Sequence, residues 1–80
     1  MGGIEVLRRV LQEFPMIQVL VLSAYDDLAY IQGTLAEGAK GYLLKDEAPA
    51  LLVEAIHKIH DMHSGTWVSP EIEKRLTHLP

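Results

Sequence analysis

The fold is decided by residues 17–45, which read IQVLVLSAYDDLAYIQGTLAEGAKGYLLK. The two ends of this stretch, Ile17–Leu22 and Gly41–Lys45, are short apolar runs that predict β-strands. Between them, Asp27–Glu37 repeats apolar residues at helical spacing. Asp26 or Asp27 can cap this helix, and Gly38 can serve as the left-handed residue that ends it. Two strands joined through a helix form a right-handed parallel crossover. Strands this rich in apolar residues are typical of a parallel sheet covered by helices on both faces.

Further helices are predicted on both sides of this unit. Ile4–Phe14 carries an apolar stripe and ends before a proline. Pro49–Ser64 repeats apolar residues at helical spacing, and a glycine follows it. Ser69-Pro70-Glu71 reads as a helix start, with the helix continuing through Leu76. The sequence therefore predicts an α/β fold with two parallel strands, three main helices and a short C-terminal helix.

Composition restricts the class of protein. The chain has 80 residues, of which 49% are hydrophobic and 22% charged, and this excludes intrinsic disorder. A net charge of −4 argues against direct nucleic-acid binding and against an anionic membrane surface. There is no cysteine, no apolar segment long enough to span a membrane and no visible signal peptide. A cytoplasmic protein is expected.

The last residues of the two predicted strands are the first candidates for a binding site. Ligands of open parallel sheets bind at the carboxyl ends of the strands. Ser23 and Lys45 occupy those ends, and a hydroxyl beside an ammonium suits a phosphoryl group. The competing interpretation is that Ser23 is a capping serine and Lys45 a solvated lysine.

Three parts of the chain together resemble a known family. Residues 17–27 and 36–46, reading IQVLVLSAYDD and AEGAKGYLLKD, resemble the second half of a two-component response-regulator receiver domain, with its CheY-like, flavodoxin-like fold. Gly2–Arg9 resembles the loop and helix after the family's phosphoacceptor aspartate. Gly65–Glu71 resembles the linker of the branch that carries a C-terminal helix-turn-helix domain. The resemblance implies a truncated receiver over residues 1–65 and a linker-like tail with a short helix over 66–80.

The resemblance also implies roles for four residues. Ser23 matches the family's hydroxyl residue that contacts the phosphoryl group, and Ala24 matches the small residue beside it. Lys45 matches the lysine that pairs with phosphate. Tyr42 matches the switch aromatic, which turns inward when the hydroxyl residue moves; the alternative is an ordinary packed tyrosine.

The parts of the family's pattern that do the phosphoryl chemistry are not found in these 80 residues. The family's phosphoacceptor aspartate and the acidic pair that binds Mg²⁺ belong to segments that would precede residue 1. Asp26 and Asp27 match the start of a helix instead. Phosphoryl transfer needs both the nucleophile and the metal. We therefore expect no phosphoacceptor, no catalytic residue, no Mg²⁺ or other cofactor, and no enzymatic activity. An unrelated serine–lysine enzyme on Ser23 and Lys45 is a remote alternative, because no oxyanion-hole motif accompanies them.

Three histidines are candidate metal ligands. His57, His60 and His63 recur every third residue on a predicted helix. Side chains at that spacing drift around the helix and do not converge on one ion, so a solvated face is expected and no metal. Trp67 is interpreted as a local anchor of the tail.

Two functions follow from different readings of the same pattern. In the first, a truncated receiver acts as a self-association and partner-binding module. The edge of Ile17–Leu22 would lack its neighbouring strand and pair with a second copy, giving a homodimer with a four-stranded sheet. The edge residues are Ile17, Val19, Leu20, Val21 and Leu22. A response regulator or a histidine kinase is the other expected partner. In the second, the chain is a fragment of a complete phosphorylation-switched transcriptional regulator.

Overall fold

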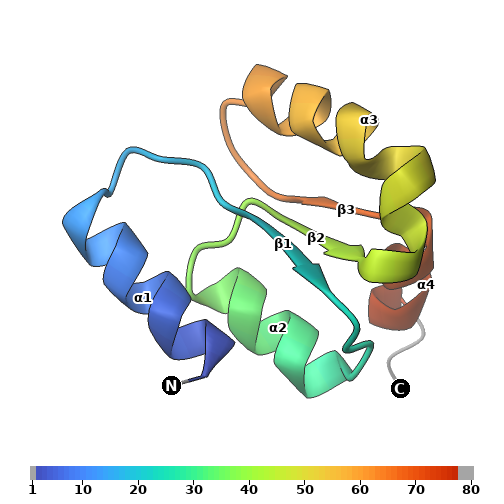
Figure 1. Ribbon diagram of the computed structural model, residues 1–80, viewed down its shortest axis with the longest axis horizontal. Helices are drawn as coiled ribbons and strands as arrows, with labels where there is room; N and C mark the ends of the chain where they lie inside the picture. The colour runs from blue at the N-terminus through green and yellow to red at the C-terminus, as the bar shows by residue number, and fades with distance from the viewer. Residues whose placement is uncertain (1, 78–80) are drawn as a thin grey trace.

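The computed structural model describes residues 2–77 and shows a small α/β fold (Figure 1). The elements are α1 (Gly3–Glu13), β1 (Leu20–Ser23), α2 (Leu28–Ala36), β2 (Gly41–Leu44), the 3-10 helix η1 (Lys45–Glu47), α3 (Ala48–Asp61), β3 (Trp67–Val68) and α4 (Pro70–Thr77). The predicted fold class and the parallel crossover from β1 through α2 to β2 are confirmed. None of the helices within residues 2–77 combines the length and apolar character that a membrane crossing requires.

The sheet has three parallel strands in the order β1-β2-β3. The prediction of two strands was wrong, because Trp67 and Val68 pair with β2 as a third strand. The Trp67 N–H donates to the Lys40 carbonyl at 2.7 Å, and Trp67 lies opposite Gly41. This pairing satisfies backbone groups of β2, and β3 becomes the second edge strand of the sheet. In the described residues β1 pairs only with β2, so its other edge is free.

Helices cover both faces of the sheet (Figure 1). On one face, Ile31 of α2, Tyr42 of β2 and Ile72 of α4 form a fully buried cluster. On the other face lies α3, whose Ile59 reaches Gly41 so closely that a Cβ there would lie 2.7 Å from the Ile59 Cδ1. The central strand β2 is thus buried on both sides, as its apolar sequence predicts.

Local sequence explains where the helices begin and end. Asp27 caps α2, and its carboxylate accepts the Tyr30 N–H. Gly38 has φ +113°, which confirms it as the left-handed residue that ends this helix. Ser69 caps α4 by accepting the Ile72 N–H. The third main helix ends at Asp61 rather than Ser64, because the backbone becomes extended at Met62 and returns toward the sheet.

The first strand is shorter than predicted and begins at Leu20 rather than Ile17. Its partner β2 begins only at Gly41, opposite Leu20, so Ile17 and Gln18 have no strand beside them. Instead, the Ile17 N–H donates to the Phe14 carbonyl, and the Gln18 side-chain amide donates to the Ile59 carbonyl. The predicted edge residues therefore divide between a loop and the strand.

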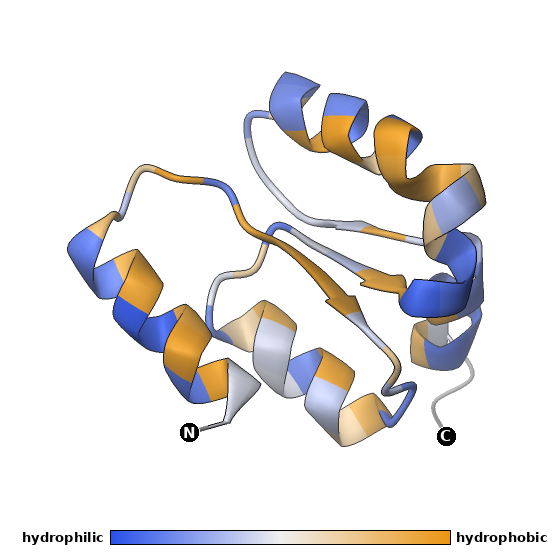
Figure 2. Cartoon of the chain, in the orientation of Figure 1, coloured by the Kyte–Doolittle hydropathy of each residue, from blue (hydrophilic) through white to orange (hydrophobic). Residues whose placement is uncertain are grey.

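Apolar side chains remain exposed along β1 and α3. Figure 2 shows β1 as a continuous hydrophobic ribbon. Leu22 of β1 is 39% exposed, and Ile17 just before the strand is 45% exposed. Val53 and Ile56 of α3 are also exposed. Apolar surface thus remains uncovered on the edge strand β1 and on α3.

Candidate functional site

The carboxyl ends of β1 and β2 bring the predicted site residues to one edge of the sheet. Ser23 is the last residue of β1 and lies opposite Leu44, the last residue of β2. Lys45 follows Leu44 directly and opens η1 rather than ending the strand. The parallel register therefore places Ser23 at the end of β1 and Lys45 one residue beyond the end of β2.

Ser23 is buried at this edge and is held by its own loop. Its side chain is 7% exposed, and its Oγ accepts the Tyr25 N–H at 3.0 Å. This hydrogen bond turns the chain away from the sheet immediately after the strand. Ala24 lies in that turn and is exposed. The Lys45 side chain is exposed as well, so the two candidate phosphoryl contacts differ in their access to solvent.

Tyr42 lies inward, beneath the same loop. Its ring is fully buried between Ile31 and Ile72, and its hydroxyl donates to the Tyr25 carbonyl at 2.6 Å. Burial raises the pKa of the Tyr42 phenol, and the nearby Ser23 hydroxyl partly opposes that rise. The tyrosine and the serine are thus joined through one loop residue, Tyr25, which contacts both.

A row of aromatic rings connects this buried position to the surface. The ring of Tyr30 meets that of Tyr42 edge-on, with centroids 6.3 Å apart. The ring of Tyr25 lies 5.3 Å from that of Tyr30 and is largely exposed. Such tilted and edge-on pairs stabilise aromatic packing beyond the area that they bury.

The carboxylates near the strand ends do not fit a Mg²⁺ site. Asp26 forms an ion pair with Arg75 at 3.0 Å, and Asp27 caps α2. The Glu47 carboxylate accepts the Leu44 N–H and the Ser69 hydroxyl. Among residues 2–77, no three histidine, aspartate or glutamate side chains gather as a cation site requires.

The three histidines lie at the far end of α3. His57 and His60 are exposed on the helix, and His63 follows its last turn. The His60 Nδ1 lies 3.2 Å from the carboxylate of its neighbour Asp61. These positions agree with a solvated helix face.

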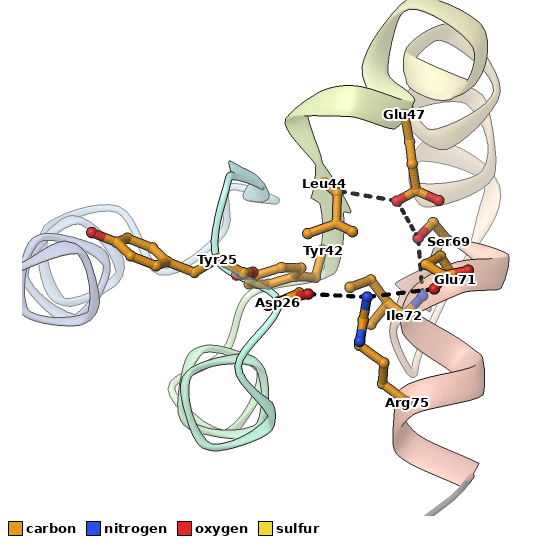
Figure 3. Close-up of polar contacts among 9 residues, drawn as sticks. All are labelled: Tyr25, Asp26, Tyr42, Leu44, Glu47, Ser69, Glu71, Ile72 and Arg75. Atoms are coloured by element: carbon orange, nitrogen blue, oxygen red, sulfur yellow. Dashed lines mark hydrogen bonds and ion pairs between the residues drawn. The ribbon is translucent and has the colours of Figure 1, made fainter.

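Two polar contacts near the site, one ion pair and one hydrogen bond, were not predicted; we call them the polar ties of α4 (Figure 3). Arg75 of α4 reaches Asp26 in the loop after β1, and Ser69 donates to Glu47 just after β2 at 2.6 Å. The members of each pair are far apart in the sequence, and each residue alone reads as an ordinary surface or capping residue. Only the packing of α4 on the sheet brings them together.

A comparison of this sequence with known protein families agrees with the order of the elements and with the residues at the strand ends. Residues 1–57 match the response regulator receiver domain family. The chain belongs to this family. The receiver match ends within α3, so β3 and α4 lie outside it.

Curated relatives of this receiver sequence are named as transcriptional regulatory proteins. It is 36% identical over 75 residues to DegU of Brevibacillus brevis, which covers 94% of this chain and 31% of that protein. It is 34% identical over 75 residues to LnrK of Bacillus subtilis, with 94% and 33% covered. The chain thus spans about a third of the length of these relatives. No solved structure matches it significantly.

Proposed function

We propose that this chain is a self-associating receiver module that keeps the residues with which the family contacts a phosphoryl group and responds to it. The observation that carries the proposal is the strand-end arrangement, in which Ser23 ends β1, Lys45 directly follows the end of β2, and Tyr42 lies beneath them. A hydroxyl and an ammonium at this edge suit a phosphoryl oxygen. Ala24 leaves room beside them. In this proposal Ser23 and Lys45 contact the phosphoryl group, and Tyr42 registers the contact.

The proposal assigns no phosphoacceptor, catalytic residue or cofactor to residues 1–80. The acidic side chains at the strand ends already pair with Arg75, cap α2 or bind the Ser69 hydroxyl. A nucleophilic aspartate needs a bound cation beside it to transfer a phosphoryl group. We expect the chain incubated with acetyl phosphate and Mg²⁺ to gain no phosphoryl group by intact mass. A mass gain of one phosphoryl group that hydroxylamine removes would contradict this.

Binding of a phosphoryl group at the strand-end site is tested separately with inorganic phosphate. We expect phosphate to shift the amide resonances of Ser23, Ala24 and Lys45 in a two-dimensional NMR titration. Lys45→Ala should abolish the shifts. Lys40→Ala is the matched control, because Lys40 precedes β2 at the opposite end of the strand. Equal loss of the shifts in both variants would show only non-specific attraction to positive charge.

Self-association is proposed from the free edge of β1 and the surface around it. The chain exposes 5460 Å², whereas a compact chain of 8.9 kDa exposes about 4,800 Å². The excess is close to the ~800 Å² that one partner buries in a typical interface. Pairing of β1 with β1 of a second copy would cover the edge, and three strands per copy make the joint sheet larger than the four strands first expected.

A second candidate function is supported by the relatives. Their names describe transcriptional regulators, and the chain covers about a third of them. In this alternative the chain is part of a phosphorylation-switched regulator with a helix-turn-helix domain, residues 66–80 are its linker, and a histidine kinase is its partner in the cytoplasm. The in-frame genomic sequence on both sides decides: an acidic-pair segment before residue 1 and a DNA-binding segment after residue 80 would support it.

A further inference from the structure

Helix α4 is attached to the fold by apolar packing and by two polar contacts near the strand-end site. Ile72 is fully buried and packs against Tyr42 and Ile31. At the start of the helix, Ser69 is fully buried and donates to the Glu47 carboxylate. In its second turn, Arg75 reaches Asp26 (Figure 3). Leu76 of α4 packs against the same cluster, so the helix is fixed by the apolar contacts of Ile72 and Leu76 and by two polar contacts.

The two polar ties end in the two segments that carry the candidate site. Asp26 directly follows Tyr25, whose carbonyl accepts the Tyr42 hydroxyl and whose N–H donates to Ser23. Glu47 lies two residues after Lys45, and its carboxylate also accepts the Leu44 N–H at the end of β2. Helix α4 thus bridges the loop after β1 and the turn after β2.

The Arg75 tie is the more adjustable of the two. Its guanidinium is shared between Asp26 at 3.0 Å and Glu71, one turn earlier in α4, at 3.4 Å. Its Nε is buried without a hydrogen-bond partner among the described residues. Because Glu71 moves with the helix, Arg75 keeps one carboxylate partner when Asp26 withdraws. The tie can therefore open without leaving a buried unpaired charge.

We propose that α4 is a latch whose docking is coupled to the inward position of Tyr42. When α4 is docked, Arg75 holds Asp26, and the adjoining Tyr25 carbonyl stays in place to accept the Tyr42 hydroxyl. When the loop after β1 shifts, the Asp26 tie and the Tyr42 hydrogen bond are lost together, and the ring of Tyr42 no longer supports Ile72. The coupling rests on these contacts alone. Only its use to report a bound phosphoryl group rests on the proposed function.

The coupling between α4 and Tyr42 must act equally in both directions, so the latch can be tested without any ligand. If α4 docking favours the Tyr42–Tyr25 hydrogen bond, then that bond must favour docking by the same factor. The test compares amide hydrogen exchange by NMR in the whole chain and in two single variants. Arg75→Ala should speed exchange of the Tyr25 amide, and Tyr42→Phe should speed exchange across residues 72–77. We expect each effect to be about two- to five-fold, the size that a half-exposed ion pair supports.

Three further measurements make the outcome decisive. Asp26→Asn removes the same ion pair from the loop side and should speed exchange across residues 72–77. Arg8→Ala is the matched control, because it removes an exposed ion pair to Glu37 on the opposite side of α2. It should leave both segments unchanged. Exchange in α1 must also stay unchanged in the latch variants, which separates latch release from global unfolding.

The proposal is overturned if either variant acts only on its own segment. Arg75→Ala that speeds exchange in α4 but not at Tyr25 would make α4 a passive attachment. So would Tyr42→Phe with unchanged exchange across residues 72–77. A negative phosphate titration would count against the proposed phosphoryl reading and would leave the latch intact, so the two failures are distinguishable.

Discussion

At the scale of single residues, Tyr25 contacts both Ser23, which ends β1, and Tyr42, which lies within β2. Its N–H holds the Ser23 side chain, and its carbonyl holds the Tyr42 hydroxyl. Tyr25 was not singled out from the sequence, because it makes both contacts with its backbone and its identity as tyrosine does not signal them. The positions of Ser23 and Lys45 could be predicted, because the ends of parallel strands follow from the apolar runs alone.

Removal of the Tyr42 hydroxyl tests this residue-scale arrangement. Tyr42→Phe deletes one hydrogen bond inside a buried cluster, so we expect the free energy of unfolding to fall by about 1 kcal/mol. Urea denaturation followed by circular dichroism measures it. Tyr30→Phe is the matched control, since the Tyr30 hydroxyl forms no hydrogen bond with another described residue. Equal effects of both variants would refute the role of the Tyr42 hydroxyl.

The raised pKa of Tyr42 predicts a pH dependence of stability. Because the folded chain holds the phenolic proton more tightly than the unfolded chain, this contribution is complete below about pH 10. It is lost as the pH rises through the pKa of the folded state. The free energy of unfolding should therefore fall less steeply above about pH 10 in Tyr42→Phe than in the parent chain. If the free energy of unfolding depended on pH in the same way in both proteins, burial would not raise the pKa of this phenol.

At the scale of elements, the sheet depends on a close approach between β2 and its neighbours. A Cβ on Gly41 would lie 2.7 Å from the Ile59 Cδ1, and 2.9 Å from both the Leu20 Cδ1 and the Trp67 carbonyl oxygen. The two side-chain ends can move aside, whereas the carbonyl belongs to the paired backbone of β3. Glycine at this position therefore allows α3, β1 and β3 to meet at one point.

Gly41→Ala tests this close approach. We expect the free energy of unfolding to fall by about 2 kcal/mol, in the range of overpacked cores. Chemical denaturation measures the change. Gly2→Ala is the control, since a Cβ at Gly2 meets nothing within 4 Å and should have almost no effect. A Gly41→Ala variant as stable as the parent would mean that β3 is not held where the structure places it.

The sequence allowed most elements to be predicted, and β3 shows why the rest could not be. Helical spacing, the Asp27 cap and the Gly38 stop are local signals, and the structure confirms them. Trp67 and Val68 form too short a run to signal a strand, and they become one only because β2 offers a free edge. The start of β1 was predicted too early for the same reason, since its length depends on where the partner strand begins.

At the scale of the whole molecule, β1 is one of the two edge strands of the sheet, and it carries exposed apolar side chains. Leu22 and Ile17 are partly exposed along it, and Val53 and Ile56 add exposed apolar side chains on α3. An edge of this kind favours pairing with another strand. The central claim of our proposal, self-association, depends on this surface.

A charge placed on the edge strand should weaken that association. We expect Leu22→Lys to raise the dimer dissociation constant at least ten-fold, because natural edge strands use lysine to prevent pairing. Size-exclusion chromatography with light scattering measures it. Val6→Lys is the matched control, because Val6 is similarly exposed, at 44% against 39%, but lies on α1. Equal weakening by both lysines would place the interface elsewhere or attribute the effect to charge alone.

Sedimentation equilibrium over a range of concentrations, with far-ultraviolet circular dichroism on the same samples, tests the central claim most directly. Our account predicts a folded dimer that loses structure as dilution dissociates it, because association covers the edge that one copy leaves open. A folded monomer whose mass and spectrum do not change with concentration would contradict the account.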